Sequence, residues 1–171
     1  MDLKSLIRDV PDYPSEGILF RDLTPVMGDP RAMQYIADRM SDHLGSLKVE
    51  AIAAIDSRGF IFGAPIAAKL DIPFVPIRKA GKLPPPVIGV DYSLEYGTAR
   101  LELSTSAVDQ GRRVAVVDDL LATGGSAGAG AKLVTELGAE VVSLAFLVEL
   151  EFLNGRSALP DCTDVFSMVK Y

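Results

Sequence analysis

The sequence predicts an α/β fold, with a central, mostly parallel sheet, helices on both faces, and a small additional N-terminal segment. Short, continuously apolar runs such as 51–55 and 114–117 are typical of strands that are buried on both faces. Stretches with helical spacing of apolar residues lie between these runs. Because strands that alternate with helices form crossover connections, we expect the strands to run parallel in one sheet.

The chain has 171 residues, of which 49% are hydrophobic and 23% charged. This length and composition predict one compact domain with a substantial core, spanning residues 1–171.

The first half of the chain contains two predicted helices and two predicted strands. Asp29 and Pro30 form a good helix start, and the apolar residues that follow recur at helical spacing over about 30–44. The buried run 51–55 predicts a strand. A helix over 59–70 and a second buried strand over 74–77 follow.

The second half begins with a proline-rich stretch. Residues 81–97 contain three consecutive prolines and predict a long loop, of the kind that often has a function. A strand is expected over 99–103 and the clearest buried strand over 114–117. A helix from about 126 to 137, ended by Gly138, and a strand over 141–148 complete the pattern.

Charge and targeting features exclude several classes of protein. The 23 acidic and 17 basic residues give a net charge of −6, which argues against a nucleic-acid or anionic-membrane surface. No signal peptide and no apolar run of ~18 residues is present, so no membrane span is expected. The single cysteine, Cys162, rules out an internal disulfide, and a cytoplasmic location is expected.

No catalytic role is predicted for the single histidine or the single cysteine. His43 lies on the polar side of the helix over 30–44 and is interpreted as a surface residue. Cys162 is interpreted as a small, partly buried residue. With one histidine and one cysteine, metal sites built mainly from these residues are excluded.

The strongest functional pattern follows the strand at 114–117. Asp118 and Asp119 come first, and Thr123 to Ser126 then open a helix through two glycines. Amides at a helix N-terminus suit a phosphate, whereas the two carboxylates suit ribose hydroxyls or a hydrated Mg²⁺. The predicted ligand is a sugar phosphate. The segment lacks the Gly-Lys-Ser/Thr of a triphosphate P-loop and the glycine spacing of a dinucleotide site.

Residues 116–126, Val-Val-Asp-Asp-Leu-Leu-Ala-Thr-Gly-Gly-Ser, closely resemble the phosphoribosyl pyrophosphate (PRPP) signature of type I phosphoribosyltransferases. The resemblance implies that Asp118 and Asp119 hold the ribose hydroxyls. It also implies a cradle for the 5′-phosphate made by Ala122, Thr123, Gly124, Gly125 and Ser126. Ser126 stands where threonine is common in the family, and the hydroxyl is retained.

Two further segments match the family's pyrophosphate-binding parts. Residues 56–59 match its pyrophosphate loop, which implies contacts from Ser57 and Arg58 and a cis peptide between Asp56 and Ser57. Arg78, Lys79 and Lys82 form a basic cluster in an acidic chain. In the adenine-specific branch, the similar segment reaches pyrophosphate partly across a dimer interface.

The segment Tyr-Ser-Leu-Glu-Tyr-Gly at 92–97 resembles the mobile catalytic loop of the adenine-specific branch. The resemblance implies a mobile loop over about 80–98. Glu95 is then the candidate for proton transfer to or from the base, and Tyr96 the candidate for a loop-closing contact.

Residues 17–22 resemble the N-terminal hood of the same branch, a segment expected over about 1–28. On its own, Phe20 suggests a core residue and Arg21 a surface ion pair. The resemblance instead implies that Leu19, Phe20 and Arg21 contact adenine through backbone polar atoms and an aromatic face. Phe20 and Leu120 would lie on the two sides of the flat base.

Together these segments imply a purine-salvage transferase that converts adenine and PRPP to AMP and pyrophosphate. Mg²⁺ is expected, held mainly by PRPP and water and not directly by the protein, and a homodimer is implied by the family. Two alternatives remain: a transferase for hypoxanthine, guanine or xanthine, and a regulatory protein that binds PRPP without turnover.

Overall fold

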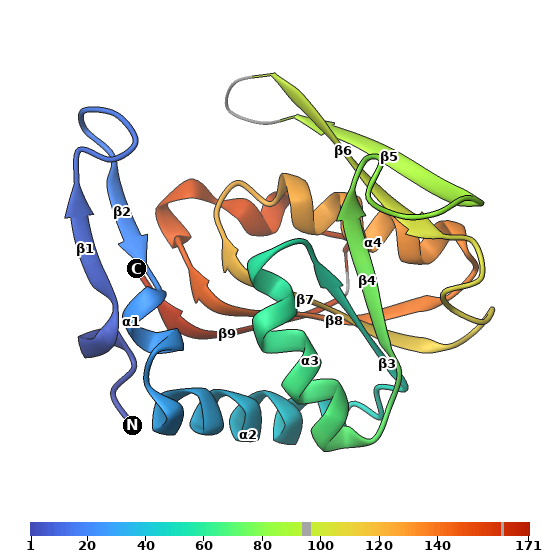
Figure 1. Ribbon diagram of the computed structural model, residues 1–171, viewed down its shortest axis with the longest axis horizontal. Coiled ribbons are helices and arrows are strands. Elements are labelled where there is room, and N and C mark those ends of the chain that lie inside the picture. The colour runs from blue at the N-terminus through green and yellow to red at the C-terminus, as the bar shows by residue number, and fades with distance from the viewer. Residues whose placement is uncertain (94–96, 162) are drawn as a thin grey trace.

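The computed structural model describes residues 1–93, 97–161 and 163–171. Within these residues one sheet contains seven strands in the order β5-β6-β4-β3-β7-β8-β9 (Figure 1). Their bounds are Ala51–Ile55 (β3), Phe74–Lys79 (β4), Val87–Ser93 (β5), Thr98–Ser104 (β6), Arg113–Leu121 (β7), Glu140–Glu149 (β8) and Asp164–Lys170 (β9). Strands β4, β3, β7, β8 and β9 run parallel, while β6 is antiparallel to both β4 and β5. The predicted mostly parallel α/β fold is confirmed.

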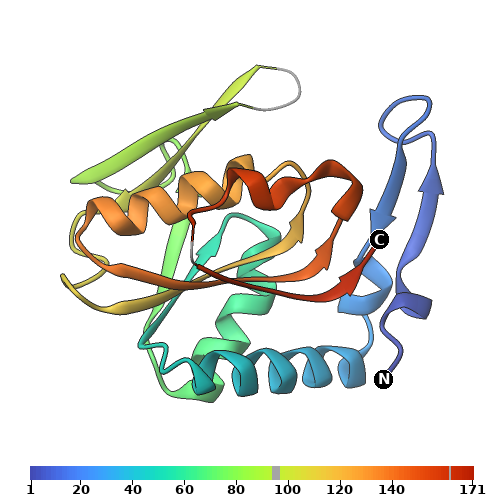
Figure 2. The same cartoon turned by 180° about the vertical axis from the view of Figure 1, so that it is seen from behind.

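Helices cover both faces of this sheet, as Figures 1 and 2 show. Helices α2 (Pro30–Ser46) and α3 (Arg58–Leu70) pack on one face, and α4 (Gly125–Glu136) packs on the other. Alternate residues of β3 belong to the two cores: Ile52 lies on the side of α2 and α3, and Ala53 on the side of α4. Such burial on both faces explains why the central strands are continuously apolar.

The helix boundaries follow the predicted signals. The Asp29 carboxylate accepts hydrogen bonds from the backbone amides of Arg31 and Ala32 at 2.8 and 3.1 Å, so it caps α2. After α4, Gly138 takes a φ of +81°, a conformation that favours glycine.

The predicted hood segment, 1–28, folds as a separate hairpin followed by a short helix. Strands β1 (Arg8–Pro11) and β2 (Leu19–Asp22) pair antiparallel, and α1 (Thr24–Met27) follows. A 3₁₀ helix, η1 (Lys4–Leu6), precedes the hairpin. Arg21 stacks over the Tyr171 ring at 3.7 Å and Lys4 donates to the Lys170 carbonyl at 3.0 Å, so this segment contacts the end of the chain.

The predicted long loop at 81–97 is wrong in part, because β5 occupies residues 87–93. Ile88, Val90 and Tyr92 point to the core in strand alternation, and the whole of β5 pairs with β6. The prolines at 84–86 precede this strand and do not interrupt its ladder. The strands β1, β2 and β9 were not predicted, because their mixed polar and apolar sequences carry no clear strand pattern without the strand with which each pairs.

His43, interpreted from the sequence as a surface residue, is partly exposed and also makes structural contacts. Its Nε2 lies 2.8 Å from Asp164 Oδ2, and its ring stacks on Phe166 with centroids 4.2 Å apart. Ser143 donates to the same carboxylate oxygen at 2.7 Å. His43 therefore joins the end of α2 to β8 and β9.

No helix of the described residues is long and apolar enough to span a membrane.

Two helical glycines predict opposite effects of the same substitution. A Cβ at Gly63 in α3 would lie 2.7 Å from the Ala54 Cβ, whereas one at Gly45 in α2 would meet Leu70 Cδ2 at an ordinary 3.4 Å. Gly63→Ala should therefore lower the free energy of unfolding by about 1–3 kcal/mol through overpacking. Gly45→Ala should leave it unchanged or raise it by up to about 1 kcal/mol, because alanine favours helix. Urea unfolding of both variants tests this; equal effects would contradict the packing described.

Candidate active site

The site lies where neighbouring strands send their helices to opposite faces of the sheet. Strands β3 and β7 are parallel neighbours, yet α3 follows β3 onto one face and α4 follows β7 onto the other. Such a switch point opens a crevice beyond the carboxyl ends of the strands. A pocket of about 490 Å³ occupies this position, between the loops after β3 and β7.

Most of the predicted PRPP-binding residues line this pocket. Asp118 and Asp119 do so from β7, which continues through them to Leu121 instead of ending at Val117 as predicted. The five residues of the predicted phosphate cradle also line it: Ala122, Thr123, Gly124, Gly125 and Ser126. The structure thus brings together the two predicted halves of a sugar-phosphate site.

The phosphate loop, residues 122–126, has a backbone suited to an anion. Gly124 has a φ of +84°, and α4 begins at Gly125. The first amides of a helix have no intrahelical acceptor, so those at the start of α4 can donate to a phosphate. A Cβ at Gly125 would lie 2.9 Å from the Ser93 carbonyl oxygen, which shows how closely the end of β5 approaches this loop.

The acidic pair is buried beneath the pocket. Asp118 and Asp119 are 8% and 4% exposed, and the Asp119 amide donates to Asp118 Oδ1 at 2.9 Å. Burial, followed by the charge of Asp119, raises the pKa of Asp118 well above its usual range. Burial also raises the pKa of Asp119, while the Arg58 guanidinium opposes this shift.

The loop after β3 meets the acidic pair directly. Arg58 Nε lies 2.7 Å from Asp119 Oδ2, and the Asp56–Ser57 peptide bond is cis, as the family resemblance implied. A Cβ at Gly59 would lie 2.8 Å from the Val117 carbonyl oxygen, so glycine allows the start of α3 to approach β7. Ser57 and Arg58 both line the pocket.

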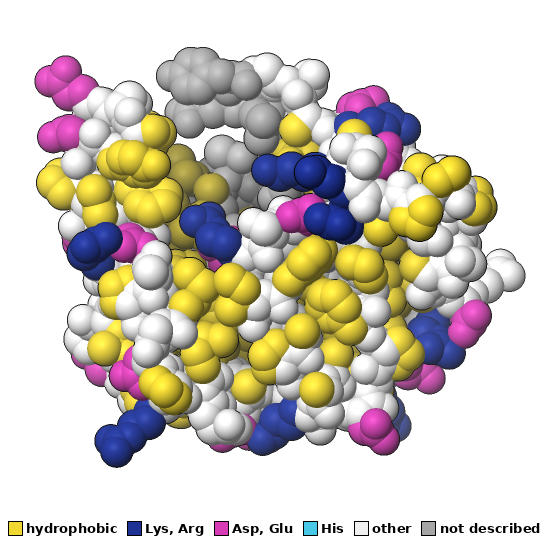
Figure 3. All heavy atoms as spheres, in the orientation of Figure 1, with side chains coloured by type: hydrophobic (Ala, Val, Ile, Leu, Met, Phe, Trp, Pro, Cys, Tyr) yellow, Lys and Arg dark blue, Asp and Glu magenta, His cyan; other side chains and the backbone are white. Residues whose placement is uncertain are grey.

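The predicted basic cluster divides into different environments. Lys79 lines the pocket, whereas Arg78 and Lys82 do not. Arg78 donates to Asp56 Oδ2 at 3.1 Å and to the Lys82 carbonyl at 3.2 Å, so it joins the loop after β3 to the turn after β4. Lysine and arginine side chains gather below the β5–β6 hairpin (Figure 3). This arrangement places positive charge beside the acidic pocket.

The end of β5 adds two pocket residues to which the sequence assigned no role. Tyr92 and Ser93 line the pocket and lie against Gly125 of the phosphate loop. Burial, and then the charge of Asp118, raises the pKa of Tyr92. The alternation of Ile88, Val90 and Tyr92 was a usable strand signal, but the preceding prolines concealed it.

The predicted base-binding residues are only partly brought to this pocket. Leu120 lines it, whereas Leu19, Phe20 and Arg21 do not. Phe20 packs edge-on against Tyr13 at 5.2 Å, and Arg21 forms an ion pair with Asp9. Glu95 and Tyr96, the predicted catalytic residues, lie outside the described residues.

The residues of the pocket are compatible with Mg²⁺ supplied together with a phosphorylated ligand. Among the described residues no group of three or more metal-ligating side chains is present. The paired carboxylates of Asp118 and Asp119 nevertheless suit Mg²⁺, which commonly binds one or two carboxylates together with phosphates and water.

Comparison with known proteins agrees with this geometry. Residues 29–170 match the model of the phosphoribosyl transferase domain. The chain therefore belongs to the phosphoribosyl transferase domain family.

Within this family the chain belongs with the adenine phosphoribosyltransferases. The chain is 54% identical over 161 residues to the adenine phosphoribosyltransferase of a Cyanothece species. The match covers 94% of this chain and 95% of the relative. The identity to the enzyme of Gloeobacter violaceus is 50% over the full length of both chains.

Solved structures of adenine phosphoribosyltransferases share the fold. The Thermoanaerobacter pseudethanolicus protein superposes with a TM-score of 0.95 at 49% identity, covering 99% of this chain and 98% of its own. The Saccharomyces cerevisiae protein was solved in complex with an imino-altritol bisphosphate and adenine. It superposes with a TM-score of 0.93 at 41% identity, covering 98% of this chain and 96% of its own.

The buried acidic pair predicts that Asp118→Asn stabilises the ligand-free protein at neutral pH. The new amide side chain can still accept a hydrogen bond from the Asp119 amide but carries no charge to bury. A carboxyl whose pKa is raised on folding holds its proton more tightly when folded, so the wild type loses stability as pH rises through that pKa. Tm should thus rise by a few degrees at pH 7, with a gain that shrinks towards pH 4, while catalytic activity falls.

Thermal unfolding at both pH values measures this effect. Asp42→Asn, at an exposed site on α2, is the matched control and should change Tm little at either pH. A lower Tm for Asp118→Asn at pH 7, or a gain that grows towards pH 4, would contradict the description of the acidic pair.

Proposed function

We propose that the chain transfers the phosphoribosyl group of PRPP to adenine and releases pyrophosphate, yielding AMP in purine salvage. The observation that carries this proposal is the pocket region where the acidic pair, the phosphate loop and the loop around Arg58 meet. In this proposal the three parts bind the ribose, the 5′-phosphate and the pyrophosphate of PRPP, respectively.

Each part of PRPP has a proposed set of partners. The amides and hydroxyls of residues 122–126 bind the 5′-phosphate, and Asp118 and Asp119 accept the ribose hydroxyls. Ser57, Arg58 and Lys79 face the pyrophosphate, and Lys82 reaches it from the turn after β4. The described contacts of Arg78 favour a positioning role for this residue, through Asp56 and the Lys82 carbonyl.

The base is proposed to bind between Leu120 and the hood segment. Leu120 supplies an apolar surface inside the pocket, and residues 19–21 of β2 supply backbone polar atoms and the Phe20 ring. Phe20 is half-buried and reaches the base only if the ligand bridges the pocket and the hairpin. A structure with bound adenine would test the proposed contact between Phe20 and the base.

The reaction forms one bond and breaks another at C1 of the ribose. N9 of adenine attacks C1 as the bond from C1 to the pyrophosphate oxygen breaks. The proton on N9 is transferred to a general base of the protein. Arg58 and Lys79 stabilise the charge that develops on pyrophosphate, and alignment of the two substrates supplies much of the acceleration. Mg²⁺, when bound with PRPP, adds positive charge at the leaving group.

Glu95 is proposed as the group that exchanges a proton with the base, and Tyr96 as a closing contact. Ser93 pairs with Thr98 across the β5–β6 hairpin, and Tyr92 and Ser93 line the pocket. Both proposed residues follow Ser93 closely in the sequence. The segment about 80–98 is proposed to be the mobile catalytic loop and 1–28 the hood. A homodimer and a cytoplasmic location complete the proposal.

The first test measures AMP formation with competing bases. Purified protein with PRPP and Mg²⁺ should convert adenine to AMP, and should prefer adenine when hypoxanthine, guanine and xanthine compete in one reaction. Chelation of Mg²⁺ should abolish turnover and its return should restore it. Binding of PRPP without turnover of any of these bases would favour a regulatory protein and overturn the proposal.

The second test concerns proton transfer. Glu95→Gln keeps the shape of the side chain but removes the carboxylate, so kcat should fall by roughly 10²–10⁴, with KM for PRPP little changed. Glu136→Gln, at the exposed far end of α4, is the control and should behave as wild type. Unchanged kcat in Glu95→Gln would remove Glu95 from this role.

A further inference from the structure

The phosphate loop rests against a segment that has no part in the proposed reaction. Two short 3₁₀ helices, η2 (Glu151–Leu153) and η3 (Gly155–Ala158), follow β8. A Cβ at Gly124 would overlap the Gly155 carbonyl oxygen, and a Cβ at Gly155 would overlap the Ala122 carbonyl oxygen. The loop and η3 thus touch backbone to backbone.

The start of α4 rests on the same segment. A Cβ at Gly128 would lie 2.6 Å from the Ala158 carbonyl oxygen. Because glycines at 124, 128 and 155 leave no side chain between the two backbones, a displacement of η3 is transmitted directly to the phosphate loop.

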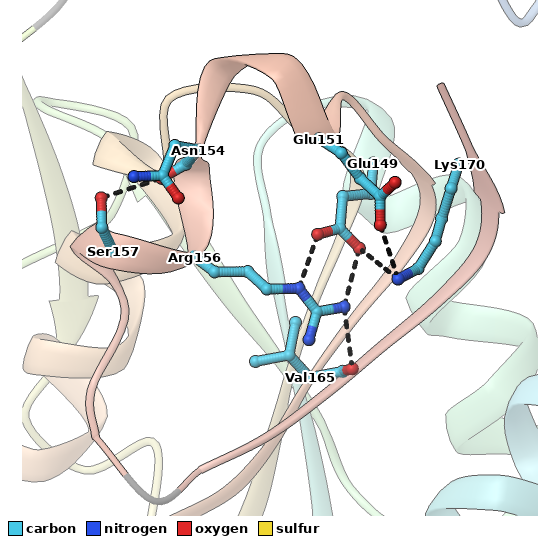
Figure 4. Close-up of polar contacts among 7 residues, drawn as sticks. All are labelled: Glu149, Glu151, Asn154, Arg156, Ser157, Val165 and Lys170. Atoms are coloured by element: carbon cyan, nitrogen blue, oxygen red, sulfur yellow. Dashed lines mark hydrogen bonds and ion pairs between the residues drawn. The ribbon is translucent and has the colours of Figure 1, made fainter.

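An ion pair holds η3 in this position. Arg156 Nε and Nη2 donate to the two carboxylate oxygens of Glu149 at 2.6 and 2.8 Å (Figure 4). Nη2 also lies 3.4 Å from the Val165 carbonyl oxygen of β9. The pair therefore joins η3 to both β8 and β9.

Glu149 is well placed to serve as the fixed end of this pair. It is the last residue of β8, its side chain is 4% exposed, and it lies in register with Leu121, the residue just before the phosphate loop. Hydrogen bonding from Arg156 lowers the pKa of Glu149 to about 2, so the carboxylate stays charged at neutral pH. Lys170 adds a more distant contact, 3.9 Å from Glu149 Oε2.

We propose that the Glu149–Arg156 pair positions the phosphate loop, and thereby sets the affinity for the 5′-phosphate of PRPP. The inference rests on the proposed function, since it concerns the same phosphate site. Neither residue lines the pocket, so both are positioning residues that act through η3. Loss of Arg156 leaves a buried carboxylate without its fork of donors, and η3 must then move to rehydrate it.

The test compares kinetic constants for the two substrates. Arg156→Met and Glu149→Gln should each raise KM for PRPP on the order of tenfold and weaken binding of ribose 5-phosphate by a similar factor. KM for adenine should stay within about twofold, because the base does not contact this loop. The double variant should be no worse than the more damaging single variant, since both substitutions break one interaction.

Arg156→Lys provides a milder variant if Arg156→Met does not fold. Lysine keeps the positive charge but cannot form the two parallel bonds, so KM for PRPP should rise less than in Arg156→Met. An unchanged KM for PRPP in both Arg156→Lys and Glu149→Gln would overturn the proposal.

The matched control breaks an ion pair at the other end of the same strands. Arg113 Nη1 lies 3.0 Å from Glu140 Oε2, where β7 and β8 begin. Arg113→Met should leave KM for PRPP and ribose 5-phosphate binding as in the wild type. Equal changes in Arg113→Met and Arg156→Met would show a general loss of stability and would also overturn the proposal. A wild-type protein that makes no AMP would instead overturn the proposed function itself.

Discussion

The structure depends on one topological constraint: two adjacent parallel strands, β3 and β7, are followed by helices on opposite faces of the sheet. The helices that follow them diverge from the carboxyl ends of these strands, and the two loops are free to face each other. The pocket, the placement of Arg58 against Asp119 and the approach of Gly59 to Val117 all follow from this divergence. The connections between strands and helices therefore determine where the site forms, and the individual side chains determine what it binds.

Burial of two neighbouring carboxylates is the main energetic cost of this arrangement. Asp118 and Asp119 lie in a strand whose other residues form the two cores, and the burial that packs those residues raises the pKa of both acids. The Arg58 guanidinium offsets part of this cost for Asp119. A protein selected only for stability would not keep this pair, so its presence in the middle of the sheet agrees with a role in binding.

The sequence predicted those parts of the structure that depend on local signals. The apolar runs at 51–55 and 114–117, the Asp29 cap and the glycine after α4 identified central strands and helices. The contiguous 116–126 segment likewise identified the phosphate loop and acidic pair. The position of Tyr92 in the pocket and the Arg58–Asp119 ion pair were not predicted. Both join segments far apart in the chain, and the prolines that precede β5 concealed the apolar alternation that marks it as a strand.

The contact between the hood and the last residues has a consequence for biosynthesis. Lys4 and Arg21 precede every strand of the central sheet, whereas their partners are Lys170, the last residue of β9, and Tyr171, which follows it. These contacts cannot form while the chain is still being translated through β7 and β8. The hairpin is synthesised before the central sheet, yet its contact with Tyr171 forms only after β9 has emerged.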